Sequence, residues 1–252
     1  MSLKQHAIWT VILVVGGFVG TIMTEGKERF FPFAAGFGII FGIVLGFRAV
    51  IDIALDVANW IRIHPRDANP KARISARFVS QLRYLAAWRD PRDGGRYDAF
   101  VLIAHSQGSV IAAEILRYLQ AARHPLLAAL ETRKLYLFTM GCPLRQLYSL
   151  RFPHQYAWAR HNAASWAGTE PDPVHLGVAE WVNAYRSGDY VGRYLWHPDT
   201  GEDQWKPEPF PLTGANPRRE FCIGPGDHTH YWEKSAPRIA EELDRIIEQA
   251  CR

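Results

Sequence analysis

The stretch between residues 99 and 121 constrains the fold most, because an apolar run of strand length passes directly into a helical pattern. Residues 99–104 (AFVLIA) are continuously apolar, as expected of a strand that is buried on both faces. The apolar residues that follow recur on one side of a predicted helix: Val110, Ile111, Ile115 and Leu119. A buried strand joined at once to a helix indicates a parallel α/β arrangement.

Strands and helices alternate along the rest of the chain. The other predicted strands are residues 135–139, 181–185 and 220–223. A linker containing prolines is expected at residues 64–70, followed by an amphipathic helix over residues 74–88 and, near the end of the chain, a helix capped by Ser235. This alternation predicts an α/β domain over residues 49–252, with a mainly parallel sheet flanked by helices.

The junction of the first strand and its helix reads Ala104-His105-Ser106-Gln107-Gly108, the small-x-Ser-x-Gly pattern of a nucleophile elbow. A sharp turn of this kind lifts the serine hydroxyl above the sheet edge in a strained backbone conformation. Residues 104 and 108 are expected to be small so that strand and helix can close together. The backbone N–H of Gln107, at the helix start, would face an oxyanion forming beside the serine. Ser106 is therefore the candidate nucleophile, and a serine in an ordinary strand-to-helix turn is the alternative.

A serine nucleophile needs a base, and in sites of this type the base comes last in the chain. The late candidates are His228 and His230, which follow the last predicted strand and precede the last helix. The alternative for this His-x-His pair is a metal site, but no third ligand follows at an obvious spacing. No metal and no cofactor are therefore expected.

The base in turn needs an orienting acid between the serine and the histidine in chain order. Asp189 is the first candidate, because it directly follows the predicted strand at 181–185 and has a glycine on each side that would let the loop turn sharply. Asp172 is the second choice, since no strand leads into it. Asp227 adjoins the candidate base in sequence, which is poor geometry for facing its ring.

The first 48 residues differ in character from the rest of the chain. Residues 7–23 and 30–47 carry no charge, and both stretches are near the lower limit of length for a helix that crosses a bilayer. Small residues recur at every fourth position of the second stretch, at Ala34, Gly38, Gly42 and Gly46. Because such spacing lets two membrane helices approach closely, a transmembrane helical hairpin is predicted over residues 1–48.

A hairpin returns both of its ends to one side of the membrane. Lys4 and Arg48, with more basic residues following, favour the cytoplasmic side of an inner or cytoplasmic membrane for the bulk of the chain. A secretory signal peptide and a buried hairpin inside a soluble core are the alternatives, but no small-x-small cleavage site stands out after Met23.

Charge and cysteine content exclude several classes of partner and site. The formal net charge is only +4, from 29 basic and 25 acidic residues, and the basic residues are dispersed, so nucleic acid is not an expected partner. The three cysteines are an odd number without metal-ligand spacing, so neither a disulfide framework nor a zinc module is indicated.

Several segments together resemble bacterial α/β-hydrolase-like proteins of the lipase and esterase kind. These segments are AHSQGSVIAAEIL, MGCPLRQLY with RFP after it, WVNAYRSGDYVG and HTHYW, and the resemblance covers roughly residues 50–250. It implies Ser106 as nucleophile, Asp189 as acid and His228 as base, because His228 is the histidine three positions before Tyr231. It also implies that Cys142, where a small residue is usual, is a packing residue.

The sequence departs from that family in what precedes the elbow. The elbow strand of an α/β-hydrolase normally follows several strands, and a loop after an early strand normally supplies the second oxyanion donor. Neither is found before residue 99. A reduced or partial α/β-hydrolase fold is therefore expected, with the strand at 99–104 at or near a sheet edge or covered by a partner chain or missing segment.

These observations lead us to expect a membrane-anchored serine hydrolase that cleaves carboxylic esters through an acyl-serine intermediate. Tryptophans and tyrosines on the long loops at 152–180 and 197–218, next to a membrane anchor, suggest a lipid or another apolar ester. The alternative is a non-catalytic, membrane-anchored interaction module that keeps the fold but lacks a complete oxyanion hole.

Overall fold

The computed structural model describes residues 53–61, 69–131, 134–159, 171–196, 210–212 and 218–251. The chain divides into two units, Met1–Ile63 and His64–Arg252, and of the first unit only residues 53–61, a helix, are described. The predicted hairpin over residues 1–48 lies outside these ranges. Within them, no helix is both long enough and apolar enough to cross a membrane. The hairpin and the domain boundary after residue 48 therefore stay predictions.

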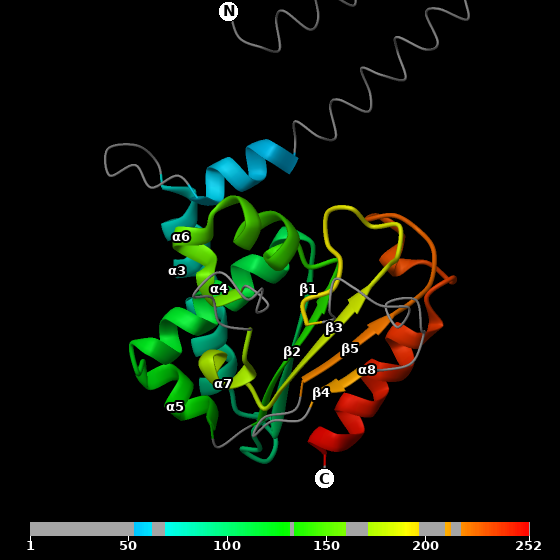
Figure 1. Ribbon diagram of the computed structural model, residues 1–252. Coiled ribbons are helices and arrows are strands. Elements are labelled where there is room, and N and C mark those ends of the chain that lie inside the picture. The colour runs from blue at the N-terminus through cyan, green and yellow to red at the C-terminus, as the bar shows by residue number, and fades with distance from the viewer. Residues whose placement is uncertain are drawn as a thin grey trace, which may run out of the picture. The chain divides into compact units, whose positions relative to one another are not determined.

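The second unit is built on a sheet with the strand order β1-β2-β3-β5-β4 (Figure 1). Four of its strands are parallel: β1 (Ala99–His105), β2 (Lys134–Met140), β3 (Glu180–Tyr185) and β5 (Arg218–Cys222). The short β4 (Phe210–Leu212) pairs antiparallel with β5 at one edge. The predicted mainly parallel sheet and its four strands are confirmed, whereas β4 lies in a segment that was expected to be a loop.

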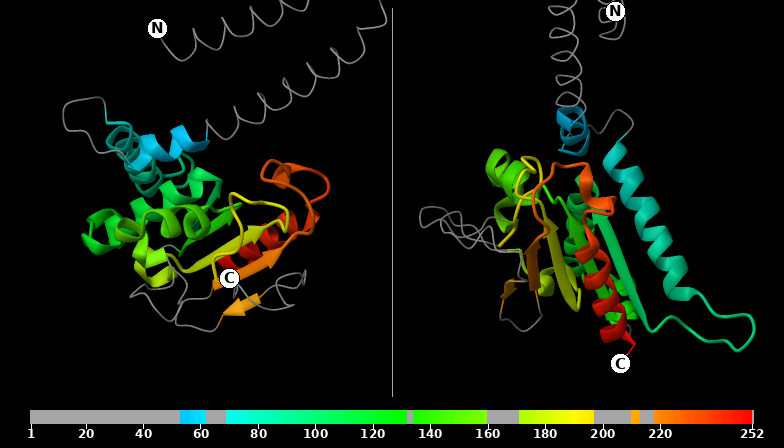
Figure 2. Two further views of the ribbon diagram at one scale, coloured as in Figure 1. Left: turned by 45° about the horizontal axis from the view of Figure 1, so that its top comes forward. Right: turned by 90° about the vertical axis from the view of Figure 1, so that its right-hand side faces the viewer.

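Helices cover both faces of the sheet (Figures 1 and 2). On one face lie α4 (Gln107–Ala121), α5 (Pro125–Glu131) and α7 (Pro173–Leu176), of which α4 contacts β1 and α5 contacts β2. On the other face, α8 (Pro237–Ala250) packs against β1 and β2. The flanking helices of the predicted α/β arrangement are therefore present.

Two predicted helix boundaries are wrong. The helix α3 (Pro70–Ala87) begins at Pro70, inside the expected linker, because Asn69 caps it by accepting a hydrogen bond from the Ala72 N–H, and proline suits the first helical position. At the other end of the chain, α8 begins after Ala236 without a side-chain cap. The Ser235 hydroxyl instead accepts a hydrogen bond from the Arg186 guanidinium, at 3.1 Å.

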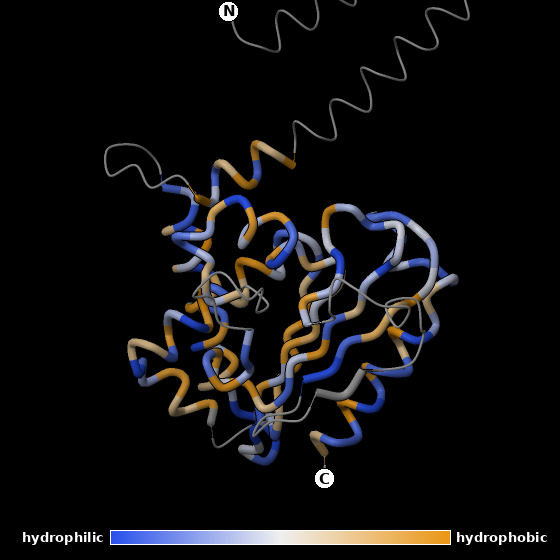
Figure 3. Tube along the Cα trace, viewed as in Figure 1, coloured by the Kyte–Doolittle hydropathy of each residue, from blue (hydrophilic) through white to orange (hydrophobic). Residues whose placement is uncertain are grey.

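The apolar core is centred on β2 and β3. Every residue of β2 except Lys134 is buried, and so is every residue of β3. Alternate side chains of β2 pack with those of α8 in one cluster that includes Tyr136, Phe138, Ile239 and Ile246. Apolar residues accordingly follow the strands in Figure 3. The two buried central strands therefore fix the position of the carboxyl end of the sheet, where the loops that carry the candidate site begin.

In the described part of the chain, β1 forms the other edge of the sheet and pairs only with β2. The prediction that this strand lies at or near a sheet edge is thus confirmed for these residues. The expectation that it is buried on both faces is wrong, since Phe100 is buried but the Ile103 side chain is 48% exposed. An edge strand has a neighbour on one side only, which leaves part of its surface open.

Candidate active site

Ser106 lies where β1 turns into α4, with φ 55° and ψ −132°. A non-glycine residue with a positive φ of this kind is strained by about 1–3 kcal/mol, so surrounding contacts must hold it in place. The Ser106 N–H donates to the Met140 carbonyl of β2, and its carbonyl accepts from the Ser109 N–H, each at 3.0 Å. The strained elbow predicted from the sequence is therefore present and tied to both β2 and α4.

The expected reason for a small residue at position 108 is wrong. In the described part of the chain, a Cβ added to Gly108 would meet nothing within 4 Å. Strand and helix are instead joined by the buried Ser109, whose hydroxyl donates to the Ala104 carbonyl at 3.1 Å.

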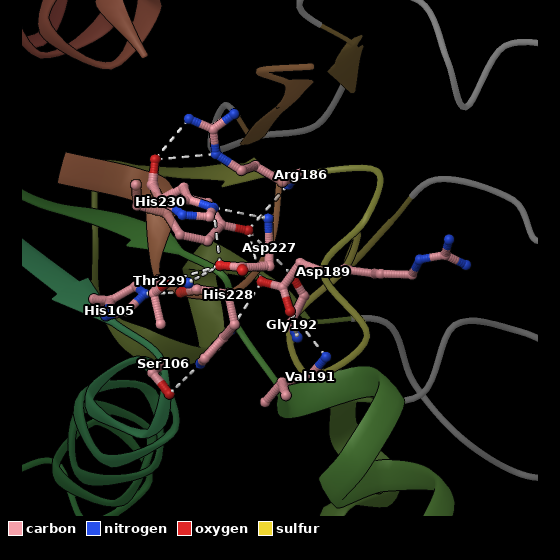
Figure 4. Close-up of polar contacts among 12 residues, drawn as sticks. His105, Ser106, Arg186, Asp189, Val191, Gly192, Asp227, His228, Thr229 and His230 are labelled. Atoms are coloured by element: carbon pink, nitrogen blue, oxygen red, sulfur yellow. Dashed lines mark hydrogen bonds and ion pairs between the residues drawn. The ribbon is translucent and has the colours of Figure 1, made fainter. Parts of the chain in front are cut away.

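The structure brings together side chains from three strand ends (Figure 4). Ser106 follows β1, Asp189 follows β3 and His228 follows β5; these strands are parallel, so their carboxyl ends share one edge of the sheet. His228 Nε2 lies 2.6 Å from Ser106 Oγ, and His228 Nδ1 lies 2.8 Å from Asp189 Oδ2. With Nδ1–H donated to the carboxylate, Nε2 is left as an acceptor for the serine hydroxyl.

Asp189 is buried and accepts hydrogen bonds through both carboxylate oxygens. Its Oδ1 accepts from the Val191 and Gly192 N–H groups at 2.8 and 2.9 Å, and its Oδ2 accepts from the Tyr231 hydroxyl at 2.8 Å as well as from His228. Burial raises the pKa of this carboxyl, but the bonds from His228, Gly192 and Tyr231 together outweigh it and the pKa is lowered. Asp189 is therefore a fixed, ionised partner for His228.

Close backbone packing holds the Asp189 loop in place. A Cβ on Gly192 would lie 1.8 Å from the Gly141 carbonyl oxygen, and one on Gly188 would lie 2.7 Å from the Gly226 carbonyl oxygen. Neither Gly188 nor Gly192 has a positive φ. The chain does turn at Gly188, as the sequence predicts, because the Asp189 N–H donates to the Arg186 carbonyl at 3.2 Å. What requires glycine at both positions is close approach to Gly141, which follows β2, and to Gly226, two residues before His228.

Two supporting residues were missed from the sequence. Besides donating to Asp189, the Tyr231 hydroxyl accepts from the Arg186 N–H at 3.0 Å. The Arg186 side chain is 2% exposed, and its guanidinium donates to the carbonyls of Pro225 and His230, on either side of His228. The only sequence signal for them is position: Arg186 directly follows β3, and Tyr231 lies three residues after the candidate base.

The alternative residues make other contacts. Asp227 accepts from the N–H and hydroxyl of Thr229, which lower its pKa, and lies 3.0 Å from His230 Nδ1. Asp172 caps α7 by accepting from the Val174 N–H. Within the described ranges, no three His, Cys, Asp or Glu side chains are grouped so that they could hold a metal ion.

The two remaining candidates are placed as follows. Gln107 is the first residue of α4, so its backbone N–H lies at the positive end of a helix directly after Ser106. Cys142 is fully buried, and burial raises the pKa of its thiol to about 12, as suits a packing residue. The described residues ahead of β1 include no strand, so an early-strand loop with a second oxyanion donor is not among them.

The structure thus joins Ser106, His228 and Asp189 by direct contacts and leaves Asp172 and Asp227 in other roles. Comparisons of the chain with protein-family models, curated proteins and solved structures found no match.

Proposed function

We propose that this chain is a serine hydrolase of the α/β-hydrolase type that cleaves carboxylic esters through an acyl-serine intermediate. The observation that carries the proposal is the contact series from Ser106 Oγ through the His228 ring to Asp189, with distances of 2.6 and 2.8 Å. A serine on a strained elbow, with a histidine base on its hydroxyl and a carboxylate on the far side of the histidine ring, is the arrangement that activates a serine hydroxyl.

In the first half-reaction, His228 Nε2 takes the proton of the Ser106 hydroxyl while Oγ bonds to the ester carbonyl carbon. The resulting oxyanion faces the Gln107 N–H at the start of α4. When the intermediate collapses, the bond from carbon to the alcohol oxygen breaks, and the leaving alcohol takes the proton from His228. The acyl group then remains on Ser106.

In the second half-reaction, water replaces the alcohol. His228 takes a proton from the water as its oxygen bonds to the acyl carbon, and then returns that proton to Ser106 Oγ as the carboxylic acid leaves. Asp189 keeps the proton on His228 Nδ1 and stabilises the imidazolium formed in each half-reaction. Tyr231 and the Val191 and Gly192 N–H groups keep Asp189 oriented.

We further propose an apolar, lipid-like ester as substrate and a membrane anchor in the first 48 residues, which places the hydrolase domain on the cytoplasmic side. Two exposed aromatic side chains support the substrate class: Trp232, 65% exposed on the His228 loop, and Tyr190, 79% exposed next to Asp189. The uncharged stretches at 7–23 and 30–47 support the anchor.

The test is to incubate the full chain in detergent with p-nitrophenyl esters of short and long acyl groups. We expect release of p-nitrophenol, faster for long acyl groups, and an acyl adduct on Ser106 in the mass spectrum. Ser106→Ala should lower kcat at least about 1000-fold, whereas Ser80→Ala, on the exposed side of α3, is the matched control and should match the parent. Equal turnover by Ser106→Ala and the parent would overturn the proposal.

A non-catalytic interaction module is the second candidate, and the edge position of β1 favours it. Loss of one oxyanion donor removes roughly 3 kcal/mol of transition-state stabilisation in comparable sites. An edge strand also presents unpaired backbone groups that a partner chain, or a segment outside the described residues, can pair with. This candidate predicts no acyl adduct on Ser106 with any ester.

A further inference from the structure

His105, the last residue of β1, contacts the residue that the proposed function makes the base. Its Nε2 atom lies 3.0 Å from the backbone carbonyl oxygen of His228. The two imidazole rings are stacked, with centroids 5.1 Å apart and an interplanar angle of 28°. Because Ser106 is the next residue in the chain, the same strand end presents the hydroxyl and contacts the base (Figure 4).

The contact acts on the part of the loop that Arg186 does not hold. The Arg186 guanidinium bonds the carbonyls of Pro225 and His230, which flank the base on either side. His105 bonds the carbonyl of His228 itself, and so limits movement of the backbone from which the imidazole projects. A misplacement of about 1 Å at such a position can reduce a rate about 100-fold.

The protonation of His105 suits this role. A carbonyl accepts only from an N–H, so the contact requires hydrogen on Nε2 of His105. Burial lowers the pKa of His105, outweighing the opposing effect of its hydrogen bond to His228. A neutral ring against His228 adds no positive charge to oppose the imidazolium that His228 forms.

The His105 ring is itself enclosed by aromatic side chains. The Tyr231 ring centroid lies 5.2 Å away and the Trp232 ring centroid 6.2 Å away. The Tyr231 ring also contacts the His228 ring, so the rings of His105, Tyr231 and His228 pack against one another. The Tyr231 hydroxyl in addition donates to Asp189, the acid that contacts His228.

We propose that His105 is a positioning residue, whose ring N–H holds the backbone of His228 against the elbow so that Nε2 stays on Ser106 Oγ during proton transfer. The inference rests on the proposed function, because it concerns the geometry of the same nucleophile and base. His105 itself takes no proton from the reacting groups.

Three variants of the full chain separate the effect of the His105 N–H donor from that of its aromatic ring and from a general loss of folding. His105→Phe keeps an aromatic ring but removes the N–H, and His105→Gln places an amide N–H where Nε2 lies. His175→Phe, at an exposed position of α7, is the matched control. With p-nitrophenyl esters, we expect His105→Phe to lower kcat about 10- to 100-fold with KM changed less than about twofold. His105→Gln should recover kcat to within about threefold of the parent, and His175→Phe should equal it.

A second measurement does not depend on turnover. In NMR spectra of chain labelled with ¹⁵N-histidine, His228 should show Nδ1–H bonded to Asp189; His105→Phe should shift and broaden this signal, and His105→Gln should restore it. Parent values of both kcat and the His228 signal in His105→Phe would overturn the inference. If the parent itself hydrolyses no ester, the proposed function fails while the His228 signal still decides the role of His105.

Discussion

At the scale of single residues, the geometry of the site depends on the hydrogen bonds that the Asp189 carboxylate accepts. Its carboxylate is buried, yet both oxygens accept hydrogen bonds from the backbone, from Tyr231 and from His228. The elbow pattern and chain order were sufficient to predict Ser106 and Asp189, and the family resemblance selected His228 over His230. Tyr231 and Arg186 could not be predicted as their supports, because those contacts depend on how the ends of β3 and β5 are placed side by side.

Removing the Tyr231 hydroxyl should weaken both the site and the fold. Tyr231→Phe leaves the buried Arg186 N–H without its acceptor and takes one donor from Asp189, so we expect the free energy of unfolding to fall by about 1–3 kcal/mol. The labelling rate of Ser106 by a fluorophosphonate should also fall, by about tenfold. Denaturant unfolding and labelling kinetics check both effects. Tyr84→Phe, at an exposed tyrosine of α3, is the control, and a loss of equal size there would contradict the assignment.

Asp189 should also make stability depend on pH. Its pKa in the folded chain is lowered from an ordinary value of 3.8, so its contribution to stability is present above that value and is lost as the pH falls through the folded pKa. The free energy of unfolding of the parent should therefore fall more steeply below about pH 4 than that of Asp189→Asn. Urea unfolding at a series of pH values measures the difference, and parallel curves would show that Asp189 is not held as an ionised group.

At the scale of elements, the strand ends are brought together by close backbone contacts. Apolar patterns were enough to predict the four parallel strands and the longer helices α3, α4 and α8, since burial against a sheet dictates those patterns. They did not predict the short helices α5 and α7. The sequence was less informative where geometry depends on neighbours: β4 is short and contains Pro211, and Gly108, a motif residue, has open space beside it. A local sequence pattern does not indicate how closely a distant segment of the chain approaches in the fold.

Two glycine substitutions distinguish these contacts. Gly192→Ala would put a Cβ 1.8 Å from the Gly141 carbonyl oxygen, so we expect a loss of about 1–3 kcal/mol of stability and displacement of the Asp189 loop. Gly108→Ala has open space and a helical position, so it should stabilise the chain by about 0.5 kcal/mol. Thermal unfolding of both variants checks the pair, and the opposite order of melting temperatures would refute this reading of the two glycines.

At the scale of the whole molecule, the candidate site sits at one end of a sheet in which β1, the strand that leads into Ser106, is an edge strand in the described residues. The absence of strand patterns before residue 99 was enough to predict this edge position. In the proposed mechanism, a second oxyanion donor could not be predicted, because it depends on backbone groups brought to Ser106 from elsewhere in the fold.

The membrane prediction also belongs to this scale. We expect the full chain to stay with the membrane pellet after carbonate extraction, because residues 7–23 and 30–47 each provide an apolar stretch of about the length that a bilayer requires. In inverted inner-membrane vesicles, protease added from outside should digest the domain that carries Ser106. Release of the intact chain by carbonate would instead assign the two stretches to a buried hairpin.

In the proposed mechanism His228 activates Ser106, and the rate of covalent labelling of Ser106 by a fluorophosphonate measures that activation. The contacts predict stoichiometric labelling of Ser106 alone in the parent, none in Ser106→Ala, and a rate at least about 100-fold lower in His228→Ala. His230→Ala, two residues along the same loop, is the matched control and should label close to the parent rate. Undiminished labelling of Ser106→Ala, or loss of labelling in His230→Ala but not in His228→Ala, would contradict the activation of Ser106 by His228.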